Sequence, residues 1–380
     1  MLSARSNGQI KNTKKTMLLT RLTSSPYFYT ILYIAVVSLL AFNLFEIVYL
    51  LIHKRNRERS EPKKEQLKRN ISTAIITEDD PSGVLPKPLT TSDFEAYTEA
   101  ASSVIESFEG EIAERAAQLV YKFGIDRHYK ELFRSPLWFK RAYAIDMLSS
   151  LRLKKNLEFF PAVFKRETSD AVKYRLLYGL SLLPRGKDDI YSLTSQLSGL
   201  PYLTAKYNED IFFNIITVLK NAGKEEEFGI FLRQIMTDSG IRVKVKRDCL
   251  SACHAAGYKQ AGLIAMEYYR TLHDEPGIAI VCIKILALMK DYTVLPEALG
   301  HKDWRVRLTV LKYAHLCDSD IRQPLKAMLH DPNYHIRLNS ALALSRLGNE
   351  GLEILQSEKN SPDKFAADVA KYALAGARTA

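Results

Sequence analysis

The sequence lacks the short motifs by which many enzymes are recognised. It contains no Gly-rich phosphate loop or Walker pattern, no G-x-S-x-G elbow and no H-E-x-x-H helix. No stretch of useful length alternates apolar and polar residues, and this excludes a protein built mainly from β-strands. We therefore expect an all-α, non-enzymatic protein with no catalytic residues and no cofactor.

Cysteine is also scarce, because the 380 residues contain four: Cys249, Cys253, Cys282 and Cys317. Their irregular spacing and apolar neighbours are typical of a reducing compartment, where cysteine serves as a small hydrophobic residue. Cys249 and Cys253 share one face of a predicted helix, but His254 points away from that face and no second pair follows. We therefore predict no metal site.

The net charge of +11 is unevenly distributed along the chain. Residues 1–90 hold 14 Lys and Arg against 7 Asp and Glu, whereas residues 91–380 hold 40 against 36. Most of the excess positive charge thus precedes the region expected to fold. This distribution speaks against nucleic acid as a partner of the folded region.

One long hydrophobic run follows a short N-terminal tail, residues 1–26. The run predicts a transmembrane helix over 27–53, because its apolar part exceeds the roughly 20 residues that a bilayer crossing needs. It is too long for the apolar part of a signal peptide. Glu46 is its one charge, and two interpretations stay open: a candidate intramembrane contact with a partner helix, or a side chain that reaches the interface.

Positive charge is denser after the hydrophobic run than before it. This asymmetry places the C-terminal part in the cytoplasm, as in a single-pass protein of a bacterial inner membrane. The basic stretch 54–69 could contact anionic lipid. Residues 54–90, first basic and then Pro-rich, are expected to form a flexible linker.

Residues 91–380 contain units that recur every 28 to 39 residues. Each unit opens with Asp, Ser or Asn as a predicted helix cap and continues with apolar residues three and four apart. Several units end in Gly, which often closes a helix. The units begin at Ser135, Ser169, Asn208, Asp238, Asp274, Asp303, Asp331 and Ser361. A pair of helices per unit would bury its apolar faces only by stacking on its neighbours, so we predict an α-solenoid of eight or nine pairs.

The clearest unit, DPNYHIRLNSALALSRLG from Asp331, resembles the HEAT repeat family, and the short C-terminal units resemble its phycobilisome-lyase-type variety. In that family a turn acid and a helix arginine form a ladder between adjacent repeats. The resemblance therefore implies a structural ladder role for Asp303, Arg307, Asp331 and Arg337.

The predicted function is a membrane-tethered scaffold that binds a protein partner on the cytoplasmic face. By analogy with bacterial HEAT proteins, the partner could belong to an envelope glycosyltransferase or signalling assembly. The alternative is a HEAT-like enzyme of the bilin lyase or DNA glycosylase type. Lys244, Lys246 and Arg247 are candidate contacts in a binding groove under either interpretation.

Overall fold

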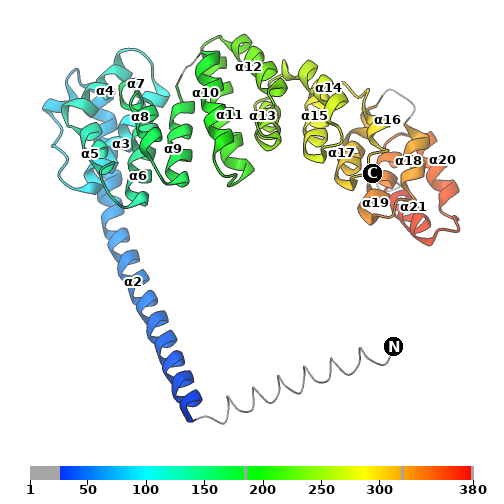
Figure 1. Cartoon of the computed structure of the whole chain (residues 1–380), viewed down its shortest axis with the longest axis horizontal. Helices are drawn as coiled ribbons and strands as arrows, with labels where there is room; N and C mark the ends of the chain where they lie inside the picture. The colour runs from blue at the N-terminus through cyan, green and yellow to red at the C-terminus, as the bar shows by residue number, and fades with distance from the viewer. Residues whose placement is uncertain (1–25, 184–185, 318–320, 378–380) are drawn as a thin grey trace. The chain divides into compact units, whose positions relative to one another are not determined.

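The computed structural model describes residues 26–183, 186–317 and 321–377. Within these ranges every regular element is a helix (Figure 1). The predicted all-α class is therefore confirmed. The chain divides into two compact units, Met1–Val104 and Ile105–Ala380.

The first unit contains α2 (Pro26–Thr77), the short 3-10 helix η1 (Pro81–Gly83) and most of α3 (Thr91–Ser107). Residues 54–77 thus form the second half of one 52-residue helix. This differs from the predicted flexible linker over 54–90, in which no helix was expected.

Packing explains why the second half of α2 is helical. Lys64 Nζ donates to Glu95 Oε2 at 3.0 Å and to Glu99 Oε1 at 2.8 Å, so α2 is tied to α3 by two ion pairs. Ile71 and Ile75 are fully buried on the same helix. The stabilising partners lie some thirty residues away in sequence, and composition alone does not reveal them.

No helix among the described residues is both long and apolar enough to cross a lipid bilayer. The predicted single-pass location in a bacterial inner membrane is therefore wrong. The predicted spanning helix over 27–53 and the predicted lipid contact at 54–69 are not supported by this finding. Glu46 is exposed on α2, and its predicted contact with a partner helix stays a prediction. The predicted tail lies, except for Pro26, outside the described residues.

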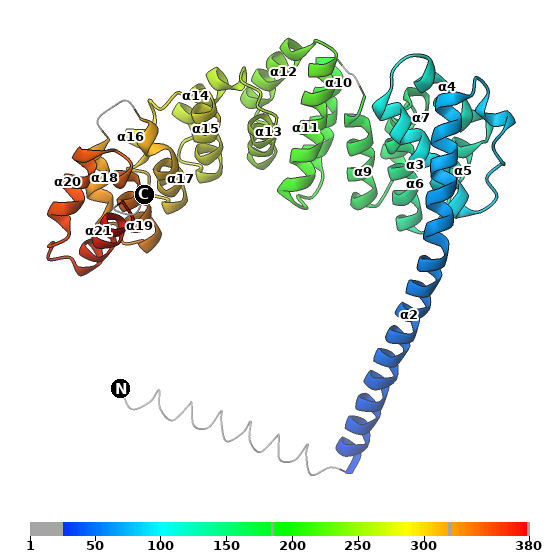
Figure 2. The same cartoon turned by 180° about the vertical axis from the view of Figure 1, so that it is seen from behind.

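The second unit begins with the end of α3 and continues through consecutive helix pairs, seen from two sides in Figures 1 and 2. One set of helices, here called row A, comprises α6 (Trp138–Ser150), α9 (Asp170–Ser181), α11 (Ala205–Asn221), α13 (Val243–Ala255), α15 (Pro276–Leu288), α17 (Trp304–Tyr313), α19 (Tyr334–Ser345) and α21 (Lys364–Ala377). Their starts lie within five residues of the eight predicted unit starts.

The remaining helices, here called row B, accompany row A. They are α4 (Glu111–Lys122), α5 (Ile125–Leu132), α7 (Lys154–Leu157), α8 (Phe160–Arg166), α10 (Lys187–Gly199), α12 (Glu225–Thr237), α14 (Ala261–Leu272), α16 (Leu295–Ala298), α18 (Arg322–Met328), α20 (Asn349–Glu358) and the 3-10 helix η2 (Ala314–Leu316).

Each row A helix packs on the next row A helix and on a helix of row B. For example, α19 contacts α17 and α21 within its row and α18 and α20 across it. Ile336 and Leu344 are fully buried at these contacts, as the helical spacing predicted. The predicted α-solenoid is thus confirmed as a stack of helix pairs.

The ends of the helices agree with prediction in part. Asp303 caps α17 by accepting the Arg305 N–H at 2.8 Å, as expected. The cap of α19 is Asn333 rather than Asp331, which lies two residues earlier in the turn. Gly348 has a φ of +73°, which an L side chain adopts only with strain, and it separates α19 from α20.

Candidate functional site

Arginine side chains tie successive row A helices together. Arg307 Nη1 donates to the carbonyl oxygens of His301 at 2.7 Å and Lys302 at 3.1 Å, in the turn before its own helix. Its Nη2 lies 2.8 Å from Asp331 Oδ2 in the next turn. We call this arrangement a rung. The structure thus brings together two of the four residues predicted for the ladder.

A second rung joins α6 to the turn before α9. Arg141 Nη1 donates to the carbonyls of Ser135 and Pro136, while Nε and Nη2 each donate to the Glu167 carboxylate at 2.8 Å. The same carboxylate accepts the N–H groups of Thr168 and Ser169. The Arg141 hydrogen bond is the main reason that the pKa of Glu167 is lowered, and the backbone bonds add to it.

Sequence reasoning missed this second rung, although a signal was present. Arg141 follows Ser135 by six residues, and Arg337 follows Asp331 by six, each time with proline as the second residue of the turn. The acid that completes the rung, Glu167, was hidden because the unit start was placed at Ser169.

Arg337 has the same position in α19 but no acid in front of it. Its Nη1 donates to the carbonyls of Asp331 at 2.7 Å and Pro332 at 3.1 Å, and its guanidinium stands 5.0 Å from the centroid of the Phe365 ring. Asp303, the fourth predicted ladder residue, pairs with Arg305 of its own turn. The structure does not connect Asp303 to a neighbouring repeat.

The middle of row A uses different chemistry. Lys246 occupies the same position in α13 as Arg307 does in α17, but it is only 6% exposed and its Nζ donates to the Met236 carbonyl at 2.9 Å. Burial lowers the pKa of Lys246. Lys246 is therefore a structural cation, and its predicted role as a groove contact is wrong because its ammonium group is enclosed.

The other two predicted groove cations, Lys244 and Arg247, converge on one tyrosine. Lys244 Nζ lies 5.0 Å from the centroid of the Tyr202 ring, and Arg247 Nη2 lies 2.5 Å from the Tyr202 hydroxyl. Arg247 also pairs with the fully buried Asp248. These cations are held by their own neighbours.

Asp248 links α13 to α11 inside the protein. Its Oδ1 accepts the Arg247 Nε–H at 2.9 Å and its Oδ2 accepts from Asn208 Nδ2 at 2.7 Å. Burial outweighs these bonds and raises the pKa of Asp248. Cys249 and Cys253 are buried beside it as free thiols. Across the described ranges, no three His, Cys, Asp or Glu side chains are placed to hold a metal ion.

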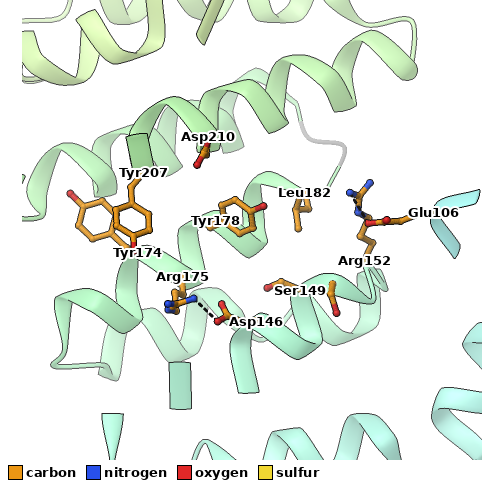
Figure 3. A pocket seen from close by; sticks show the side chains of 11 residues that line it. Glu106, Asp146, Ser149, Arg152, Tyr174, Arg175, Tyr178, Leu182, Tyr207 and Asp210 are labelled. Atoms are coloured by element: carbon orange, nitrogen blue, oxygen red, sulfur yellow. Dashed lines mark hydrogen bonds and ion pairs between the residues drawn. The ribbon is translucent and has the colours of Figure 1, made fainter. Parts of the chain in front are cut away.

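A candidate ligand site lies where α6, α9 and α11 meet. It is a cavity of about 440 Å³, here called the tyrosine cavity (Figure 3). Three tyrosines, three acids, two arginines, two serines and one leucine line it: Tyr174, Tyr178, Tyr207, Glu106, Asp146, Asp210, Arg152, Arg175, Ser149, Ser150 and Leu182. Its size lies within the range of about 300–1,000 Å³ that is usual for ligand pockets.

The three tyrosines differ in exposure. Tyr174 is buried, its hydroxyl donates to the Pro201 carbonyl at 2.8 Å, and burial raises its pKa. Tyr207 packs beside it with a centroid distance of 6.0 Å. Tyr178 and Tyr207 are 37% and 43% exposed, so their rings are available to a bound molecule.

The charges of the cavity form separate pairs. Arg175 pairs with Asp146, and this hydrogen bond raises the pKa of Arg175 (Figure 3). Arg152 Nη2 lies 3.0 Å from Glu106 Oε1. Asp210 differs, because its partner is Lys206, one turn earlier on the same helix and 77% exposed.

Ser149 forms part of the cavity wall and has an unused hydroxyl. It is 3% exposed, and its Oγ has no hydrogen-bond partner in the structure. A Cβ at Gly179 of α9 would come within 2.3 Å of this oxygen, so the close approach of α9 to α6 depends on glycine. No histidine lines the cavity beside Ser149. The wall thus offers a bound molecule a polar partner, without the adjacent base that an activated serine needs.

Sequence analysis did not predict the tyrosine cavity. The two tyrosines of α9 are four residues apart and share a face, which is a weak signal of a binding surface. The third tyrosine and Asp210 come from α11, some thirty residues later. Their meeting depends on how closely α9 and α11 pack, and sequence spacing does not supply that distance.

No protein-family model matches the chain, and no curated protein matches its sequence. Solved structures resemble it more distantly. YibA of Escherichia coli is 12% identical over 78% of this chain and 100% of its own, with a TM-score of 0.37. Human deoxyhypusine hydroxylase is 14% identical over 76% and 98%, with a TM-score of 0.23. Karyopherin Kap121p is 11% identical over 83% of this chain and 41% of its own, with a TM-score of 0.38. With these TM-scores, the similarities carry no argument about the function of this chain.

Proposed function

We propose that this chain is a non-enzymatic scaffold that binds an extended segment of a protein partner along row A. The tyrosine cavity is the anchor point of that segment. The observation that carries the proposal is the half-exposed pair Tyr178 and Tyr207 over a cavity to which three successive row A helices, α6, α9 and α11, contribute polar groups. Exposed aromatic side chains with polar neighbours are typical of protein interfaces.

The charge arrangement favours binding over catalysis. An enzyme of acid–base chemistry needs ionisable groups that act together on one reacting atom. In the tyrosine cavity Asp146 and Glu106 are each held by an arginine, and Ser149 has no base beside it. A DNA glycosylase role would need presented cations, whereas Lys246 is buried and Arg247 is held by Asp248.

Site-specific crosslinking tests the proposal on the full-length protein in its own cells. A photoreactive phenylalanine analogue at Tyr178 should crosslink one protein in a stoichiometric, discrete band. The same analogue at Ile230 of row B, which is also well exposed, serves as the control and should give no such band. Crosslinking to nucleic acid or pigment, or equal yields from both positions, contradicts the proposal.

A further inference from the structure

We propose that the tyrosine cavity receives an arginine side chain of the bound protein segment. This inference rests on the proposed function and specifies the chemistry of the partner. It follows from the charge of the cavity wall, from the position of two aromatic rings and from one buried hydroxyl without a partner.

The cavity wall has an excess of negative charge. Three carboxylates face two guanidinium groups, and both guanidinium groups already lie in ion pairs with Asp146 and Glu106. The remaining acid, Asp210, is paired through Oδ1 with the exposed Lys206 at 2.6 Å. An exposed pair within one helix is weak, because water screens it. A cation that enters the cavity can therefore take Asp210 as its own partner.

Two exposed rings line the same cavity as this carboxylate. Figure 3 shows Asp210 above the gap between Tyr207 and Tyr178, on the side of the cavity formed by α11. A flat guanidinium group can stack on a tyrosine ring while it donates two parallel hydrogen bonds to a carboxylate. An ammonium group is a compact, strongly hydrated charge and matches this combination less well.

The unused hydroxyl of Ser149 is an independent sign of a ligand. A buried polar group without a hydrogen-bond partner is unfavourable, so such groups are rare in folded proteins. Ser149 Oγ lies in the wall of the same cavity and is almost fully enclosed. Because the Oγ is enclosed against Gly179, it meets an N–H group of the bound segment only after the Ser149 side chain rotates toward the cavity.

Short peptides test the inference by calorimetry on the full-length protein. The probe is an acetylated, amidated pentapeptide with arginine at the centre of four alanines. Matched peptides carry citrulline, lysine or glutamate at the centre; citrulline keeps the shape of arginine and lacks its charge. We expect the arginine peptide to bind about tenfold or more tightly than the citrulline peptide, since hydrogen bonds to charged groups are the stronger kind. The lysine peptide should bind more weakly than arginine, and the glutamate peptide most weakly.

Variants locate the binding. Asp210→Asn and Tyr207→Ala should each remove most of the preference for arginine over citrulline. Glu209→Gln removes the same charge from the neighbouring residue, which does not line the cavity, and should leave that preference unchanged. Thermal unfolding verifies that the variants remain folded. Equal binding of arginine and citrulline peptides, tighter binding of lysine or glutamate, or an unaffected Asp210→Asn variant would overturn the inference.

The two proposals fail in distinguishable ways. If Tyr178 gives a discrete crosslink but the peptides bind equally well with or without the central arginine, the scaffold proposal is supported and the arginine site is contradicted. Arginine-dependent peptide binding without a protein crosslink would keep the cation site and remove the scaffold.

Discussion

Row A holds its neighbouring helices together in two ways. Between α6 and α9, and again between α17 and α19, a rung joins an arginine to a nearly buried acid of the next turn. Between α11 and α13 the link is the buried pair of Asn208 and Asp248. One packing scheme therefore tolerates quite different polar residues, provided that the buried polar groups find partners.

The pKa values of the acids in these two links, Glu167 and Asp248, are shifted in opposite directions. The pKa of Glu167 is lowered, because Arg141 and backbone N–H groups stabilise its charged form. The pKa of Asp248 is raised, because burial destabilises its charged form by more than the hydrogen bonds from Arg247 and Asn208 stabilise it. At neutral pH the charge of Glu167 in the rung therefore stabilises the folded state, whereas the charge of Asp248 destabilises it.

The largest expected effect comes from breaking a rung. Glu167→Ala leaves the Arg141 guanidinium without its partner in a site that is mostly enclosed. We expect the free energy of unfolding to fall by about 3 kcal/mol, the loss typical of a broken buried pair. Urea unfolding of the full chain measures it. The exposed Glu158→Ala is the control, and equal losses in both variants would show that the rung contributes nothing specific.

Lowering the pH tests the same rung without removing the side chain. The folded pKa of Glu167 lies below the ordinary value of 4.5, so its contribution is complete above that value and is lost as the pH falls through the folded pKa. The stability difference between the native chain and Glu167→Gln should therefore shrink below about pH 4.5. A difference that stays constant from pH 7 to pH 3 would refute this.

A missing rung can be added at the C-terminal end. Ser361 stands in the turn before α21 where Asp331 stands before α19, and Arg337 has no acid opposite it. Ser361→Asp should raise the free energy of unfolding by about 1 kcal/mol through a new hydrogen bond to the guanidinium. Repeating the substitution in an Arg337→Gln background should abolish the gain. A gain that persists there would assign the effect to another contact.

The smallest effect on the free energy of unfolding at neutral pH is expected at Asp248, in the middle of row A. Asp248→Asn keeps the side-chain shape and removes a charge that burial disfavours, which offsets part of the loss of its hydrogen bonds with Arg247 and Asn208, so stability should change by about 1 kcal/mol. The folded pKa of Asp248 lies above the ordinary value of 3.8, so the native chain should gain stability relative to Asp248→Asn as the pH falls through the folded pKa toward 3.8. Denaturation curves across this range would show a trend opposite to that of Glu167→Gln.

The repeat architecture could be predicted from the sequence because it depends on local patterns. Helical spacing and turn residues place the starts of α17, α19 and α21 closely, and the six-residue step from turn to arginine is visible around Asp331 and Arg337. At α11 the same approach chose the wrong capping residue. Asn208 was taken as a cap, but it is a buried partner of Asp248, and Thr204 is the cap.

The candidate site could not be predicted in the same way. Ser149, Tyr178 and Asp210 come from three helices, and none belongs to a motif of fixed spacing. Their proximity follows from Gly179, which lets α9 approach α6 closely, and from the register of α11 against α9. Likewise, the charged half of α2 is helical because Lys64 reaches acids of α3, a contact that sequence patterning does not show.

The buried cysteines give the protein an internal reporter of local opening. Burial raises the pKa of Cys249 well above its usual range and that of Cys282 to about 12, and α13 and α15, which carry them, pack together. The thiolate is the nucleophile that attacks an alkylating reagent and displaces its halide, so these side chains should be inert while the two helices stay closed. The rate at which iodoacetamide modifies them therefore measures how often this part of row A separates, and whether an occupied tyrosine cavity slows that event.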